Sequence, residues 1–141
     1  MATLKRFTDL SCWQFSRDVS IEVYNAVQNS PSFKSNFSFR DQILRSSGSI
    51  MDNIAEGFGR GGNSEFVLFL GYANGSCSEL RSQLIRAEDF GYIDSITKNS
   101  IESKIDRIEG MIIGLRKYLQ SSPYYGSRFE KDKKLKSKIS T

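Results

Sequence analysis

Five polar side chains that could take part in chemistry surround a glycine-rich segment in the middle of the chain: Asn53, Glu56, Arg60, Glu65 and Glu79. Paired carboxylates can serve acid/base catalysis or hold metal ions, and di-iron helical bundles place glutamates on facing helices. Those metal sites also need Glu-x-x-His pairs, and the chain contains no histidine. We therefore interpret the five residues as structural hydrogen-bonding groups with an Arg–Glu ion pair.

The composition argues further against an enzyme. Without histidine the chain lacks the commonest general base and the commonest zinc ligand. A nucleophile such as Ser49 or Cys77 would have no histidine to activate it. Cys12 and Cys77 stand far apart and form no CxxC motif, so neither a zinc site nor a redox site is indicated. We expect no catalysis and no cofactor.

The location expected for the protein is the cytoplasm. No basic segment followed by an apolar one stands at the Met1 end, and no stretch approaches the roughly 20 apolar residues of a membrane span. Isolated cysteines fit a reducing compartment. We therefore expect a cytoplasmic protein that does not interact with membranes.

Two glycine motifs need a choice between a structural and a functional role. Gly57-x-Gly59-x-x-Gly62 matches the dinucleotide-binding fingerprint, but that motif must follow a strand, whereas a predicted helix precedes it here. We interpret it as a turn between helices, with Arg60 and the next helix start as a possible anion site. Gly71 and Gly75 form a GxxxG motif, which predicts the close approach of a neighbouring helix, within the chain or across a subunit interface.

All the excess charge lies in the last fourteen residues. The chain has 20 basic and 16 acidic residues, a formal net charge of +4, and residues 1–127 are neutral. The basic residues of the tail are Arg128, Lys131, Lys133, Lys134, Lys136 and Lys138. Tyr125 and Phe129 lie among or beside them, and this mixture suits phosphates and stacked bases. A solvated terminus without a ligand is the alternative interpretation.

Apolar residues three and four positions apart predict four long helices whose apolar faces form the core. These core positions include Val19, Ile50, Leu80 and Ile105. We expect the helices over about residues 9–29, from Ser38 to about Gly57, from Asn63 or Ser64 to about Phe90, and from Asp94 or Ser95 to Pro123. Residues 33–37 are expected to form a loop, and Ser38 to cap the second helix. Gly91 is expected at the end of the third.

These helices predict an all-α protein. The simplest architecture that buries all four apolar faces is an antiparallel up-down-up-down four-helix bundle. The predicted organisation is an N-terminal segment over residues 1–8, the bundle over 9–122 and a basic C-terminal tail over 123–141.

Residues 47–60, which read SGSIMDNIAEGFGR, resemble a known bacterial family. Glu65-Phe66, Phe69-Leu70, Ala73, Gly75-Ser76 and Glu79-Leu80 extend the resemblance, which covers about residues 9–120. The family is that of the 23S rRNA intervening-sequence proteins, which are four-helix bundles. The resemblance implies a left-handed bundle that assembles as a ring, expected to be a homopentamer. The chain is also similar to the accessory variability determinant of diversity-generating retroelements, a pentameric bundle that binds RNA and a reverse transcriptase.

Two functions remain open at this point. In the first, a non-enzymatic homo-oligomer binds RNA through its basic tail and ring surface. In the second, the ring is a scaffold on which a protein such as a reverse transcriptase docks, with no nucleic-acid role. In that case Asn53, Glu56, Arg60 and Glu65 would orient the second and third helices and stabilise the subunit contact.

Overall fold

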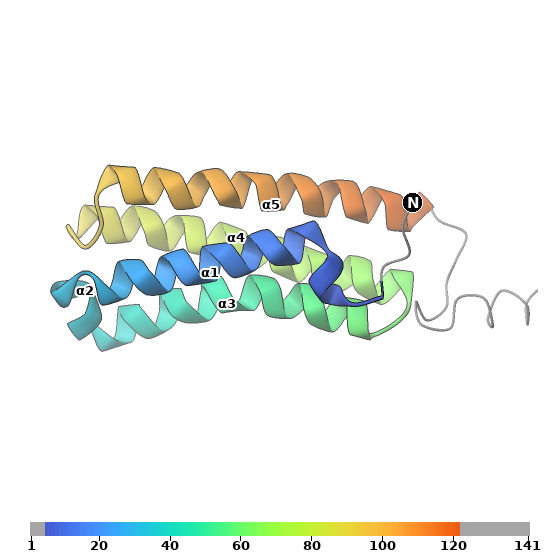
Figure 1. Cartoon of the computed structure of the whole chain (residues 1–141), viewed down its shortest axis with the longest axis horizontal. Helices are drawn as coiled ribbons and strands as arrows, with labels where there is room; N and C mark the ends of the chain where they lie inside the picture. The colour runs from blue at the N-terminus through green and yellow to red at the C-terminus, as the bar shows by residue number, and fades with distance from the viewer. Residues whose placement is uncertain (1–4, 122–141) are drawn as a thin grey trace, which may run out of the picture.

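The computed structural model describes residues 5–121, which form an all-helical bundle (Figure 1). A short 3-10 helix, η1 (Phe7–Asp9), precedes the first long helix. The α-helices are α1 (Ser11–Gln28), α2 (Pro31–Ser35), α3 (Phe37–Gly59), α4 (Asn63–Asp89) and α5 (Ser95–Ser121). The prediction of an all-α helical bundle is confirmed.

The four long helices of the described region lie lengthwise beside one another. Helix α1 packs against α3 and α5, and α4 packs against the same two helices. Each long helix therefore has two neighbours and one outward face. Short connections join α3 to α4 and α4 to α5, so these pairs are adjacent both in sequence and in space.

The first helix connection differs from the predicted loop over residues 33–37. Pro31–Ser35 form the short helix α2, because Ser30 Oγ accepts a hydrogen bond from the Phe33 N–H at 3.4 Å and Pro31 stands where no N–H is needed. The predicted cap of the second helix is also wrong. Helix α3 begins at Phe37, and Asn36 Oδ1 caps it by accepting from the Phe39 N–H at 3.3 Å.

The glycine-rich segment ends α3 later than predicted. Gly57 and Gly59 still belong to α3, and the connection to α4 is confined to Arg60–Gly62. Gly61 has a φ of 88°, a backbone conformation that glycine adopts without a steric penalty. Gly62, rather than Asn63 or Ser64, occupies the N-cap position of α4.

The connection between α4 and α5 follows the prediction closely. Gly91, with a φ of 75°, comes just after the last turn of α4, and its N–H donates to the Glu88 carbonyl at 2.9 Å. The Tyr92 N–H donates to the Ala87 carbonyl, also at 2.9 Å, which completes a Schellman motif. Asp94 Oδ1 then accepts from the Thr97 N–H at 2.7 Å and starts α5.

The core is formed by the apolar positions that the three- and four-residue spacing predicted. One side chain from nearly every turn of each long helix is fully buried, including Val19 on α1, Ile50 on α3, Leu80 on α4 and Ile105 on α5. Trp13 lies partly buried, with its ring 5.2 Å from that of Phe7. The predicted helix end at Pro123 lies outside the described residues.

Candidate functional site

The contact between α3 and α4, called here the α3–α4 seam, leaves no room for a side chain at Gly57. A Cβ atom built on Gly57 would lie 2.7 Å from Phe69 Cβ and 3.0 Å from an atom of the Phe66 ring. Real Cβ atoms do not approach other atoms this closely, so only glycine permits this helix spacing. The glycine run in the sequence therefore contains one position that sets how tightly α4 lies against α3.

Asn53 connects to α4 through a serine pair in the middle of the seam. Its Nδ2 atom donates to the Ser49 carbonyl at 2.8 Å and to Ser49 Oγ at 2.9 Å. Ser49 Oγ in turn lies 2.8 Å from Ser76 Oγ on α4. The structural hydrogen bonds predicted for Asn53 are present, but they reach α4 only through Ser49.

Glu56 and Arg60 form the ion pair that the sequence suggested. Arg60 Nη2 lies 3.1 Å from Glu56 Oε1, and both side chains are about half exposed. The Arg60 guanidinium also lies over the Phe69 ring of α4, 5.1 Å from its centre. Glu65 is exposed at the start of α4 and belongs to none of the ion pairs within residues 5–121. The predicted cluster thus reaches α4 through Arg60, whereas Glu65 stays apart.

The other half of the seam contains a hydrogen bond to Glu79, as the sequence suggested, and adds Ser46, Gln42 and Arg86, which sequence reasoning missed. Ser46 Oγ donates to the Gln42 carbonyl at 3.1 Å and to Glu79 Oε1. Arg86 Nη2 donates to Gln42 Oε1 at 3.3 Å. Serines in a helix give no directional signal in the sequence, so only the register of α3 against α4 could have revealed these contacts.

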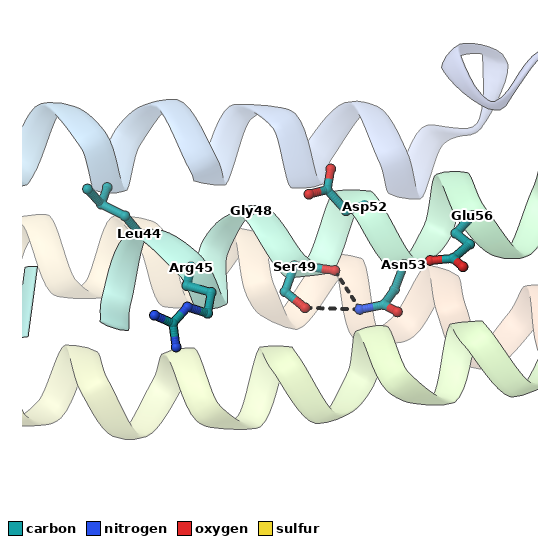
Figure 2. A pocket seen from close by; sticks show the side chains of 7 residues that line it. All are labelled: Leu44, Arg45, Gly48, Ser49, Asp52, Asn53 and Glu56. Atoms are coloured by element: carbon teal, nitrogen blue, oxygen red, sulfur yellow. Dashed lines mark hydrogen bonds between the residues drawn. The ribbon is translucent and has the colours of Figure 1, made fainter. Parts of the chain in front are cut away.

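A shallow hollow lies along the outward side of α3, with a volume of about 350 Å³ (Figure 2). Its lining residues are Leu44, Arg45, Gly48, Ser49, Asp52, Asn53 and Glu56. Apart from its chain neighbours and the backbone of its own helix, no described atom lies within 4 Å of the position that a Cβ of Gly48 would occupy. Asp52 is exposed and takes part in none of the ion pairs within the described residues. The hollow therefore combines open space with an unpaired carboxylate.

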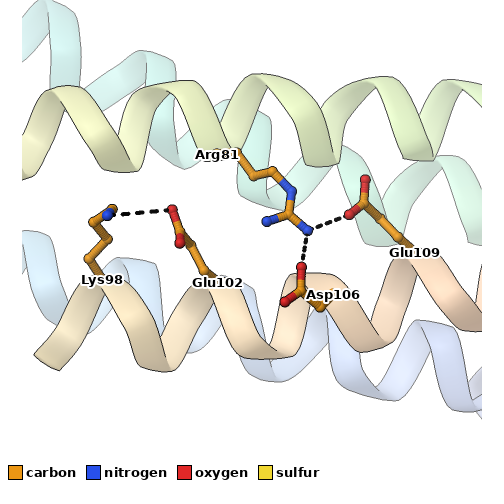
Figure 3. Close-up of polar contacts among 5 residues, drawn as sticks. All are labelled: Arg81, Lys98, Glu102, Asp106 and Glu109. Atoms are coloured by element: carbon orange, nitrogen blue, oxygen red, sulfur yellow. Dashed lines mark hydrogen bonds and ion pairs between the residues drawn. The ribbon is translucent and has the colours of Figure 1, made fainter. Parts of the chain in front are cut away.

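The contact between α4 and α5 is built on paired charges (Figure 3). Arg81 of α4 forms ion pairs with Asp106 and Glu109 of α5. Burial alone would lower the pKa of Arg81, but the hydrogen bonds to the two carboxylates raise it above its ordinary value. Lys98 lies 3.6 Å from Glu88 on α4 and 4.0 Å from Glu102 on its own helix. Each of the two cations therefore has two carboxylate neighbours.

Gly71 and Gly75 do not mark a close helix contact within the chain. Around a Cβ on Gly71 the nearest atoms belong to the Arg116 guanidinium, at 3.7 Å, and around Gly75 nothing lies within 4 Å. The intrachain form of the GxxxG prediction is therefore wrong, because the tight approach occurs at Gly57 instead. The form in which a second subunit packs there stays a prediction.

Both cysteines lie in the core. Burial raises the pKa of the Cys12 thiol to about 11, and burial together with the nearby Glu109 carboxylate raises that of Cys77 to about 12. Among residues 5–121, no three histidine, cysteine, aspartate or glutamate side chains gather as a metal ion would require. The six basic residues of the predicted nucleic-acid site, 128–138, lie outside the described residues.

Within residues 5–121, no helix is both long enough and apolar enough to cross a bilayer.

Fold and seam together define a helical-bundle protein with polar contacts between its second and third long helices. Residues 8–114 match the family described as 23S rRNA-intervening sequence protein, and the chain belongs to this family. It is also similar to the crystal structure of a protein of unknown function from the S23 ribosomal protein family of Bacteroides thetaiotaomicron. The TM-score is 0.67 at 24% identity, over 75% of this chain and 98% of that one. A search of curated proteins gives no match.

Proposed function

We propose that this protein is a non-enzymatic homo-oligomer that binds RNA through its basic C-terminal tail. The proposed particle is a ring, expected to contain five copies, of a left-handed up-down-up-down bundle over residues 9–122. It would act in the cytoplasm. The observation that carries the proposal is the placement of charge: residues 1–127 are neutral, and the last fourteen residues carry the whole net charge of +4.

The tail has the side chains that single-stranded RNA requires. Arg128 and the five lysines between positions 131 and 138 would neutralise phosphates, while Tyr125 and Phe129 would stack on bases. One short tail would bind weakly. A ring places several tails around one ligand, which raises their effective concentration and turns weak contacts into useful avidity.

The polar contacts of the bundle support a structural role rather than a chemical one. Asn53 is bonded to Ser49, whose hydroxyl contacts Ser76 of α4. Arg60 lies over the Phe69 ring of α4, and Arg81 of α4 is held by two carboxylates of α5. These groups stabilise the packing of α3, α4 and α5. They support the proposal that the bundle serves as the frame that presents the tail.

A tail truncation tests RNA binding directly. Full-length protein and a variant lacking residues 128–141 would be titrated with a fluorescent single-stranded RNA at several salt concentrations. Each phosphate contact contributes about 0.7 to the salt slope on single strands, so losing six cations should lower the slope by up to about 4 and weaken binding strongly. Unchanged affinity and slope would exclude the tail as the RNA site.

The scaffold alternative remains the second candidate. It is favoured by the unpaired Asp52 in the hollow on α3, because a protein surface could supply the missing cation. A full-length protein that assembles but binds no RNA would move the proposal to this function, with a reverse transcriptase or another protein as the docked partner.

A further inference from the structure

Two exposed surfaces of the bundle have side chains and glycines that no packing contact within a single chain explains. The first is the hollow on α3. The second, called here the α4 outer face, consists of Leu68, Gly71, Tyr72 and Gly75, whose spacing places them on one side of α4. Leu68 is 49% exposed and Tyr72 is 51% exposed. The α4 outer face thus exposes two large side chains to solvent, and two glycines lie beside them.

No packing contact among residues 5–121 requires a glycine at position 75. Glycine destabilises a helix interior relative to alanine, and nothing within 4 Å would oppose a Cβ at this position. Gly48, which opens the hollow on α3, has equally free surroundings. Glycines of this kind permit the backbone of another helix to come close.

The charges on the two surfaces are complementary. The Arg116 guanidinium lies against Gly71, and its buried Nε atom has no hydrogen-bond partner among residues 5–121. Arg81 and Lys98, the other cations of the α4–α5 contact, each have two carboxylates nearby. Asp52, in the hollow, is an exposed carboxylate that no ion pair within residues 5–121 uses. Arg45 and Glu56 also line the hollow, so its lining holds one basic and two acidic residues, a net negative charge that the cationic Arg116 would complement.

The positions of the two surfaces suit a ring. Helices α3 and α4 are neighbours in the bundle, so their outward sides face different directions. A contact between two different surfaces of identical chains is heterologous, and repeating it around an axis closes a ring when the rotation permits.

We propose that the α4 outer face of one copy packs into the hollow on α3 of the next copy, with Arg116 paired to Asp52 of that copy. This inference rests on the proposed homo-oligomer and assigns its contact surfaces. Leu68 and Tyr72 would fill the hollow, while Gly48 and Gly75 would allow the two helices to approach.

Charge reversal tests the pairing. The full-length variants Arg116→Glu and Asp52→Arg should each weaken self-association at least about tenfold, whereas the double variant should regain most of it. Mass would be followed by light scattering across a dilution series, with circular dichroism to verify folding. Arg17→Glu and Asp18→Arg on the exposed side of α1 are matched controls that should keep the wild-type mass. A double variant that stays dissociated would overturn the Arg116–Asp52 pair.

A glycine pair tests the packing without changing charge. Gly75→Leu should dissociate the particle while leaving the folded chain intact, and Gly110→Leu, an equally open position on α5, should not. If the wild type forms a ring and all three variants, Gly75→Leu, Arg116→Glu and Asp52→Arg, leave it intact, the proposed contact surfaces are wrong, whereas the proposed homo-oligomer is not. A monomeric wild type would overturn both.

Discussion

The Cβ atom of Phe69 on α4 lies only 2.7 Å from the position that a Cβ on Gly57 of α3 would occupy. The nearest obstacle is the base of a side chain on a packed helix, so it cannot rotate away. Any larger residue at position 57 must push α3 and α4 apart, and the contacts along the α3–α4 seam would weaken with them.

Gly57→Ala should therefore destabilise the protein by about 1–3 kcal/mol, although alanine favours helices. Gly59→Ala in the same helix is the matched control, because nothing lies within 4 Å of its Cβ position. We expect the control to be neutral or slightly stabilising. Urea unfolding followed by circular dichroism would measure both, and equal stability of the two variants would contradict the close contact.

The serine pair should couple α3 to α4 measurably. Ser49→Ala and Ser76→Ala each remove one side of the 2.8 Å contact, and a double-mutant cycle isolates their interaction. We expect a coupling energy of about 0.5–1.5 kcal/mol. A coupling energy of zero would mean that Asn53 is connected to α3 alone.

The helices of the bundle could be predicted from sequence because their apolar positions repeat regularly. Val19, Ile50, Leu80 and Ile105 were recognised as core positions by spacing alone, and all are fully buried. The start of the last helix was expected at Asp94 or Ser95, because both side chains can accept a hydrogen bond from an N–H of the first turn, and Asp94 is the residue that does so.

The sequence was least informative where tertiary contacts determine which of several similar residues takes a structural role. Asn36 and Ser38 are both acceptable caps, and Asn36, the cap observed, also donates a hydrogen bond from Nδ2 to the Tyr92 hydroxyl at 3.0 Å. Gly57, Gly71 and Gly75 look alike in sequence, yet of the three only Gly57 has no room for a Cβ atom. Which glycine a helix approaches depends on the rotation of each helix in the bundle, and one sequence does not specify that rotation.

Replacing Arg81, the cation shared by two carboxylates in the α4–α5 contact, should leave those carboxylates to repel each other. Arg81→Met keeps the apolar stem but leaves Asp106 and Glu109 without their partner. We expect a loss of about 1 kcal/mol, because the Arg81 side chain is 29% exposed and solvent screens the pair. Arg17→Met, at an exposed position on α1, should leave the thermal midpoint unchanged. Equal midpoints for both variants would rule out a stabilising role.

The two buried thiols should make stability fall in alkaline solution. Their folded pKa values, about 11 and about 12, lie above the ordinary value of 9.0, so the unfolded chain releases these protons first. The free energy of unfolding should therefore decline as pH rises from 9.0 toward 11. The double variant Cys12→Ala with Cys77→Ala should decline less. If a thiol reagent labels the native protein as fast as the unfolded one at pH 8, the burial is wrong.

The Asp94 cap of α5 should make stability fall in acidic solution, the opposite of the thiols. The hydrogen bond from the Thr97 N–H lowers the pKa of Asp94 below 3.8, so its contribution is present above that pH and is lost as pH falls through the folded pKa. Asp94→Ala should lower the thermal midpoint at neutral pH, whereas Asp94→Asn should retain most of the cap. Thermal melts at several pH values would show whether the aspartate cap alone weakens in acid.

The most direct test of the account is size-exclusion chromatography with light scattering and ultraviolet absorbance, on full-length protein purified at low salt without nuclease. One run reports both the mass of the particle and any bound nucleic acid. The account predicts about 80 kDa of protein, five times the chain mass of 16.0 kDa, carrying RNA that high salt releases. A 16.0 kDa monomer without nucleic acid would contradict it.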